Sequence, residues 1–153
     1  MTREVTLRRF TAEDWPWLRA WYADPQLNAQ LGPLDEDWLH HVLAEHDGVE
    51  LVASHREAPV AVVGCVWGTG EHPDHVITDL AVAPGRRREG WAAAAVQEFL
   101  AWPGHLDAPA WRAYVESGNQ VAFAFFESLG WALTETAEER GDDLHLFRRR
   151  SFG

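Results

Sequence analysis

The stretch from Val76 to Leu100 constrains this chain most, because its hydrophobic pattern changes abruptly in the middle. Residues 76–82 are apolar and rich in β-branched side chains, which predicts a buried strand. After Pro84 and Gly85, apolar residues recur at helical spacing from Trp91 onward. The sequence therefore predicts a strand, a turn and a helix in direct succession.

The turn between this strand and this helix is strongly basic, because Arg86, Arg87 and Arg88 precede Glu89 and Gly90. The first turn of a helix has backbone N–H groups without intrahelical partners and lies at the positive end of the helix dipole. Cationic side chains add to that field and predict an anion site, with phosphate as the expected anion. The chain has neither a G-x-x-x-x-G-K-[ST] loop nor a G-x-G-x-x-G fingerprint, which excludes the P-loop and dinucleotide-binding motifs.

The turn and its flanking residues resemble the pyrophosphate-binding loop of the GNAT superfamily of acyl-CoA-dependent N-acetyltransferases. That loop has the pattern Q/R-x-x-G-x-G/A after a strand that ends in an apolar residue. The matching residues here are Leu80, Ala81, Val82, Arg87, Gly90 and Ala92. A capped helix with a solvated basic turn would give the same short pattern, so this pattern alone leaves both interpretations open.

A second segment, residues 114–131, favours the family. The second signature of the family has an asparagine at a helix start, a small residue one turn later, an aromatic residue near the helix end, and then glycine and an aromatic residue. These positions are occupied here by Asn119, Ala122, Phe126, Gly130 and Trp131. Both signatures occur in the correct order and at a workable separation.

The remaining pattern predicts an α/β (α+β) chain. Alternating apolar residues predict further strands at 5–10, 49–54, 60–67, 111–115, 131–136 and 144–149, with hairpin turns at 57–59 and 138–143. Capping patterns predict helices at 11–23, 34–47, 91–100 and 119–129. The resemblance implies a GNAT-like mixed, mostly antiparallel sheet of about six to seven strands flanked by about four helices. With 153 residues, we expect a single GNAT-like domain over residues 1–153.

The composition restricts the partners. The formal net charge of -11 argues against a nucleic-acid partner and favours a cationic one, although an acidic surface also serves solubility alone. A basic cluster, Arg148–Arg150, ends the chain and is expected to be a solvated tail. Since no apolar segment has membrane-spanning length and the N-terminus lacks a signal-peptide core, we expect a cytoplasmic protein without a membrane partner. The histidines show no H-x-x-x-H pattern, so we expect no metal.

The resemblance implies an activity: transfer of an acetyl group from the co-substrate acetyl-CoA to a primary amine of a small molecule or a peptide N-terminus by direct attack. It allows a homodimer. It implies that the backbone N–H of Val82 stabilises the negative charge that develops on the thioester oxygen. The implied cofactor-binding residues are Leu80, Ala81, Val82, Arg87, Arg88, Glu89, Gly90, Trp91, Ala92, Asn119 and Phe126. For Asn119, a helix N-cap is an alternative or additional role.

The proton-transfer groups depart from the family's pattern. Thr78 stands where the family often has a carboxylate, and Phe126 where it often has a tyrosine, so neither can exchange a proton. Asp79 is our first choice as general base, although strict alternation turns it away from the face of Thr78 unless a bulge intervenes. A purely structural Asp79 is the alternative, and Glu71, His72, His75 and Glu116 are looser candidates.

The acceptor site is expected to involve aromatic residues of the first helix, because an amphipathic helix cannot bury every aromatic side chain. The expected substrate-binding residues are Trp17, Trp21, Tyr22, Thr78 and Glu116. The missing proton-transfer groups leave a second hypothesis open: a catalytically degenerate GNAT-fold protein that binds acyl-CoA as a sensor or interaction module.

Overall fold

The computed structural model describes residues 4–25, 35–44, 46–86 and 89–151. The strands are β1 Thr6–Arg9, β2 Gly48–His55, β3 Ala58–Val66, β4 His75–Val82, β5 Ala110–Glu116, β6 Ala132–Glu135 and β7 Leu144–Arg150. The α-helices of the described residues are α1 Trp15–Trp21, α3 Glu36–Ala44, α4 Trp91–Ala101, α5 Gln120–Ser128 and α6 Ala137–Arg140, with a 3-10 turn at Ala12–Asp14 before α1.

These strands are hydrogen-bonded in the order β1-β2-β3-β4-β5-β7-β6. Strands β4 and β5 pair in parallel, whereas β1–β2, β5–β7 and β6–β7 are antiparallel. The predicted fold class, a mixed and mostly antiparallel sheet with flanking helices, is therefore confirmed. Helix α6 lies where the sequence predicted only a charged turn, and it is held by its caps Thr136 and Gly141.

The chain packs as two compact units. The first comprises Met1–Cys65 and Asp79–Pro103, and the second comprises Val66–Thr78 and Gly104–Gly153. Strand β4 contributes residues to both units. The expectation of a single domain over residues 1–153 stays a prediction.

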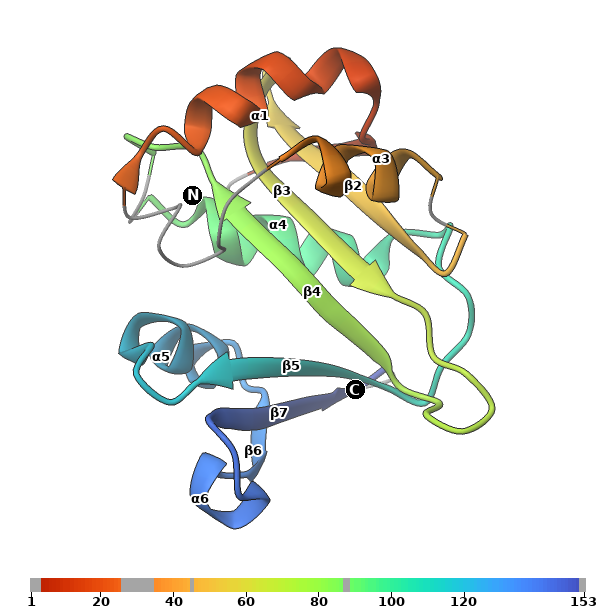
Figure 1. Ribbon diagram of the computed structural model, residues 1–153, viewed down its shortest axis with the longest axis vertical. Coiled ribbons are helices and arrows are strands. Elements are labelled where there is room, and N and C mark those ends of the chain that lie inside the picture. The colour runs from red at the N-terminus through yellow and green to blue at the C-terminus, as the bar shows by residue number, and fades with distance from the viewer. Residues whose placement is uncertain (1–3, 26–34, 45, 87–88, 152–153) are drawn as a thin grey trace. The chain divides into compact units, whose positions relative to one another are not determined.

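In the first unit, strands β1 to β3 are covered on both faces (Figure 1). On one face Phe10, Leu18, Val52 and Val62 form a buried cluster. Helices α1 and α3 pack against it with Trp17, Trp21, Tyr22, Trp38, Leu39 and Val42. Strand alternation turns His55 to the other face, where its ring lies 4.7 Å from that of Trp91 in α4. Strand β2 is buried along most of its length because helices cover both of its faces.

The β2–β3 hairpin turns at Arg56 and Glu57, so the predicted turn at 57–59 was wrong by one to two residues. Both residues have positive φ, 51° and 71°, as two-residue hairpin loops favour. Neither is one of the residues that adopt this conformation readily, so the sequence carried no signal for it. The turn signal that was read, Pro59, lies inside β3.

In the second unit, β5 pairs with β7 along its whole length, from Ala110 opposite Arg150 to Glu116 opposite Leu144. Helix α5 packs on this pair through aromatic side chains. The rings of Phe123 and Phe126 lie 5.1 Å and 5.9 Å from that of Phe147. Aromatic side chains therefore make the contact between α5 and this pair of strands.

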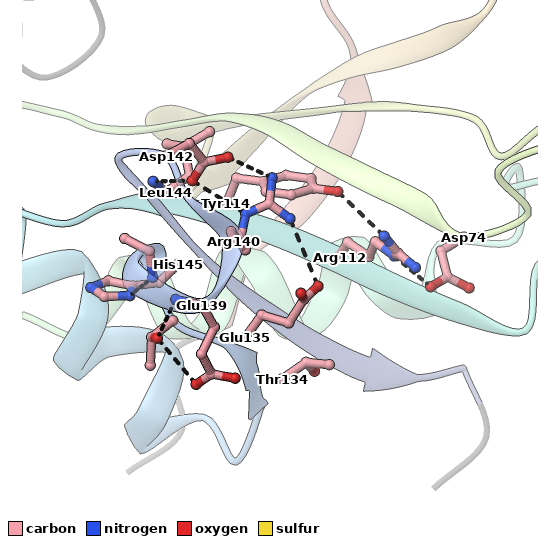
Figure 2. Close-up of polar contacts among 12 residues, drawn as sticks. Asp74, Arg112, Tyr114, Thr134, Glu135, Glu139, Arg140, Asp142, Leu144 and His145 are labelled. Carbon is pink, nitrogen blue, oxygen red and sulfur yellow. Dashed lines mark hydrogen bonds and ion pairs between the residues drawn. The ribbon is translucent and has the colours of Figure 1, made fainter.

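Asp74, a buried carboxylate, organises the polar side of this unit. It accepts hydrogen bonds from Nε of Arg112 and Nε of Arg148, both at 2.8 Å. Arg112 reaches the hydroxyl of Tyr114 at 3.4 Å, and the guanidinium of Arg140 lies 5.0 Å from the Tyr114 ring centroid (Figure 2). The expected solvated tail was wrong for Arg148, which lies in β7 and ties that strand to Asp74.

We expect Asp74→Asn to lower the free energy of unfolding at neutral pH by about 1–2 kcal/mol, because the two partly exposed guanidinium groups lose their anionic acceptor. Hydrogen bonds from Arg148 and Arg112 lower the pKa of Asp74, and burial, which acts in the opposite direction, does not cancel them. A carboxyl whose pKa is lowered by folding stabilises the fold above its unfolded-state pKa, and this contribution is lost as pH falls through the folded-state pKa.

The difference between Asp74→Asn and the parent should therefore shrink below about pH 4, the ordinary aspartate pKa. Urea denaturation at pH 7 and pH 3 measures it. The control is Asp142→Asn, which removes the carboxylate of the exposed pair with Arg140 and should have a smaller effect at pH 7. A difference between Asp74→Asn and parent that is the same at both pH values would contradict this account.

Candidate active site

The turn between β4 and α4 is built on glycines in the left-handed region. Gly85 has φ 85°, and the N–H of Arg86 donates to the carbonyl of Ala83 at 3.0 Å. Gly90, with φ 87°, is the N-cap of α4, and its carbonyl accepts from the N–H of Ala94 at 3.2 Å. Because Gly90 carries no side chain, a ligand can approach the first turn of α4 closely.

Side chains around this turn are tied to one another. Oε1 of Glu89 accepts from Nε of Arg86 at 3.1 Å and from Nε1 of Trp91 at 2.9 Å. The Arg86 guanidinium lies 5.1 Å from the Trp91 ring centroid. Trp91 is buried, and its contact with a cofactor stays a prediction. The predicted phosphate-binding residues Arg87 and Arg88 lie outside the described residues.

The two faces of β4, the strand before the turn, differ in burial. Ala81 is buried, whereas Leu80 and Val82 are half-buried and share the opposite face. Val82 is the last residue of β4, and the next residue donates its N–H to the carbonyl of Val60 at 2.9 Å. Ala92, in the first turn of α4, is half-buried. The roles of these residues toward acetyl-CoA stay predictions.

In the second unit, Asn119 is the N-cap of α5, as the alternative interpretation predicted. Its side-chain oxygen accepts from the N–H of Ala122 at 3.0 Å. This hydrogen bond engages the carbonyl oxygen of the Asn119 amide. The NH2 group of the same amide is the donor that could bind a pantetheine carbonyl. Phe126 is buried and packs against Trp131 at 5.1 Å, so its ring serves the core. A contact between Phe126 and the cofactor stays a prediction.

The predicted acceptor residues Trp17, Trp21 and Tyr22 come together in the first unit. The rings of Trp17 and Trp21 lie 4.8 Å apart. Burial raises the pKa of the Tyr22 hydroxyl well above its ordinary value, and the carboxylates of Asp79 and Glu50 raise it further. Asp79 therefore lies within electrostatic reach of Tyr22, and Tyr22 stays a protonated phenol at neutral pH.

The other predicted residues lie in the second unit. Thr78 on β4 and Glu116 at the end of β5 are both exposed. His75 is buried, its Nδ1 accepts the N–H of Gly68 at 2.7 Å, and its Nε2 lies 2.7 Å from the carbonyl of Leu106. The Gly68 bond assigns the ring proton to Nε2, so both nitrogens bind backbone groups and His75 joins two loops. Glu71 and His72 are exposed.

The sequence reasoning missed Glu50, a carboxylate in the interior of β2 that is only 5% exposed. It lies over Gly64 of the neighbouring β3: a methyl group added to Gly64 would lie 2.5 Å from Cδ of Glu50. The signal that could have found it is an acidic residue inside an apolar strand, followed by a hairpin whose second strand contains a glycine.

None of the helices described is long and apolar enough to cross a membrane. Within the same residues, no group of three or more His, Cys, Asp or Glu side chains is placed to hold a metal ion.

Solved structures share this fold over almost their full length. An acetyltransferase from Thermus thermophilus is 22% identical with a TM-score of 0.79, covering 95% of this chain and 96% of its own. Spermidine N-acetyltransferase from Vibrio cholerae, in complex with CoA and spermine, is 15% identical with a TM-score of 0.77, covering 96% and 95%. The ribosomal-protein-S18-alanine N-acetyltransferase from Escherichia coli is 15% identical with a TM-score of 0.69, covering 96% and 94%.

A search of curated proteins returned no match. The family model described as "Acetyltransferase (GNAT) family" matches residues 6–131, which include β1 to β5, the glycine-rich turn before α4 and helix α5. Both sequence signatures fall within this span. The chain belongs to the GNAT acetyltransferase family.

Proposed function

We propose that this protein transfers an acetyl group from acetyl-CoA to the primary amine of a cationic small molecule or a peptide N-terminus. The observation that carries the proposal is the turn before α4, where Gly90 at the N-cap exposes the helix N-terminus to a phosphate. The half-buried end of β4 directly precedes this turn. Family membership supports acyl-CoA as the donor.

Two solved structures support an amine as the acceptor. The Vibrio cholerae enzyme is a spermidine N-acetyltransferase with spermine bound, and the Escherichia coli enzyme acts on an alanine of a ribosomal protein. Here the aromatic residues of α1 and the carboxylates of Asp79 and Glu50 belong to one unit. Aromatic faces and carboxylates both attract an ammonium group. A cytoplasmic location and a homodimer stay predictions.

Different residues would carry the different steps of the reaction. Bound acetyl-CoA would supply the acetyl group as a thioester. Asp79, directly or through water, would remove a proton from the acceptor ammonium, so that the neutral nitrogen can form the new C–N bond while the C–S bond breaks. The Val82 N–H would donate to the thioester oxygen. Phe126 has no proton to give, so the second proton that the nitrogen loses on becoming an amide would reach the leaving thiolate through water.

The second hypothesis is a catalytically degenerate acyl-CoA-binding module, favoured by Thr78 and Phe126 at positions where the family often has proton-transfer groups. A thiol-release assay separates the two. Acetyl-CoA is presented with polyamines, aminoglycosides, amino acids and peptide N-termini. Amine-dependent release of free CoA supports the transferase, whereas CoA binding without release across the whole panel supports the module.

The acceptor's apparent KM should rise several-fold between low and high ionic strength, because attraction between an acidic protein and a cationic acceptor is screened by salt. Initial rates at saturating acetyl-CoA measure this KM. The CoA affinity, measured separately at each salt concentration, shows how much of the change belongs to the donor. An acceptor KM that is constant across the salt series would contradict a cationic acceptor.

A further inference from the structure

Asp14, a buried carboxylate, lies directly before helix α1 and binds an aromatic side chain of that helix. Asp14 is only 3% exposed. Its Oδ1 accepts the indole N–H of Trp17 at 3.0 Å and Nη2 of Arg8 at 2.6 Å. Its Oδ2 accepts Nη1 of Arg8 at 2.7 Å and the backbone N–H of Thr11 at 2.9 Å. One carboxylate therefore joins strand β1, the turn after it and the first turn of α1.

The charge of Asp14 is compensated within the protein. Arg8, whose side chain is about half exposed, pairs with it through two hydrogen bonds. Burial alone favours the neutral carboxyl, but the hydrogen bonds that it accepts, foremost those from Arg8, outweigh burial and lower the pKa of Asp14. The group is therefore an ionised acceptor at neutral pH and needs no further cation.

Helix capping does not explain the bond between Asp14 and the indole. Asp14 is the N-cap of α1, and an N-cap side chain ordinarily accepts a backbone N–H of the first helical turn. Among the described residues, its carboxylate makes no such bond to α1 and accepts the side-chain N–H of Trp17 instead. Arg8 and Thr11 already tie Asp14 to the preceding strand and turn. The bond to Trp17 has a further effect, because it fixes the orientation of the indole ring.

Trp17 and Trp21, one turn apart on α1, form an aromatic corner. Their rings lie 4.8 Å apart with an angle of 51° between their planes, and both side chains are half-buried. Both pack against the buried cluster of the first unit. Tyr22, the next residue along the chain, lies within electrostatic reach of Asp79, the candidate general base. The aromatic corner and the candidate base are thus connected through Tyr22 within the first unit.

We propose that Asp14 is a positioning residue for the acceptor: it holds the indole of Trp17 so that the aromatic corner binds an ammonium group of an alkyl amine. The proposal rests on the proposed function. A bond to a buried, fixed carboxylate restricts the rotation of the indole before the ligand arrives, so less entropy is lost on binding. The carboxylate also polarises the indole N–H and makes the ring face more negative, which strengthens its attraction to a cation.

The test is a double-mutant cycle between Asp14→Ala and Trp17→Phe, with spermidine as the probe. Phenylalanine keeps an aromatic ring but has no N–H for Asp14 to accept. In the parent background, Asp14→Ala should raise the Kd for spermidine, measured by calorimetry with CoA present, by about tenfold. In the Trp17→Phe background, the same change should have less than about a twofold effect, because Asp14 acts through the indole.

Two control variants separate positioning from damage to the fold. Trp21→Phe removes the other indole of the aromatic corner and leaves the bond between Asp14 and Trp17, so the effect of Asp14→Ala should persist in that background. Arg8→Lys loosens the ion pair of Asp14 but keeps the indole bond, so it should lower the thermal midpoint and preserve the spermidine Kd. The kcat and the CoA affinity of Asp14→Ala should stay near parent values. If circular dichroism shows that Asp14→Ala does not fold, Asp14→Asn takes its place in the cycle, since a neutral amide binds the indole more weakly than a carboxylate.

The outcomes separate this proposal from the proposed function. If the parent acetylates amines and loss of the Asp14 carboxylate leaves the spermidine Kd unchanged, or raises it equally in the parent and Trp17→Phe backgrounds, the positioning role is overturned and the transferase stands. If the cycle shows coupling but the parent acetylates no amine of the panel, the positioning role stands and the transferase fails. A parent that does not bind spermidine overturns the aromatic corner as an ammonium site, and amine-dependent thiol release then decides the transferase on its own.

Discussion

Gly90→Glu should weaken CoA binding by about 3 kcal/mol, which corresponds to roughly a hundredfold in Kd. Gly90 has φ 87°, a conformation that residues with a Cβ rarely adopt, and it is the N-cap of α4. A glutamate there places its own carboxylate where the phosphates of CoA are expected to bind. It both occupies the free N–H groups of the helix and repels the incoming anion. Titration calorimetry with CoA measures the loss.

Two controls separate charge from backbone strain in this experiment. Gly90→Ala introduces the strain without the charge and should lose much less affinity. Gly141→Glu adds the same charge at another helix-terminal glycine, with φ 78° and no atom within 4 Å of an added Cβ, and should leave CoA binding unchanged. If Gly90→Glu binds CoA as tightly as the parent, the phosphate site is elsewhere.

Local periodicity was sufficient to predict most of the fold. The change from strand to helix between β4 and α4 and the Asn-capped start of α5 both follow from short-range rules, and the structure has them where they were predicted. The hairpin at Arg56 and Glu57 could not be predicted, because the twist of two paired strands imposes positive φ on residues that do not favour it. Helix α6 is a single turn, too short for a periodic signal.

The residues of the candidate site also fall into those that a local motif identifies and those that depend on long-range contacts. The glycine-rich turn before α4 is a contiguous motif, so its residues could be identified from sequence order alone. Glu50 fits its position because Gly64 on another strand leaves space for it. Arg148 donates to Asp74, which lies far away in the sequence. Such long-range contacts follow from the pairing of strands and leave no local pattern. His75 was considered for proton transfer because of its residue type, and only the structure shows that both of its ring nitrogens lie against backbone groups of two loops.

The second large effect concerns Asp79. We expect Asp79→Asn to reduce kcat by roughly a hundredfold, the usual scale for loss of a general base, with little change in CoA affinity. Alternation on β4 separates Asp79 from the exposed face of Thr78, and the carboxylate lies within electrostatic reach of Tyr22 in the aromatic cluster of α1. An amide of equal size keeps the packing but cannot accept a proton. Single-turnover rates measured across pH test this directly.

The same pH series tests whether loss of the Asp79 carboxylate lowers the rate of the chemical step at every pH. Glu98→Gln, at an exposed position on α4, is the control for the loss of a charge. If Asp79→Asn keeps full turnover at every pH, Asp79 is structural. The proton must then leave through Glu71 or Glu116, or from the amine in solution before binding, in which case the rate follows the pKa of the acceptor chosen.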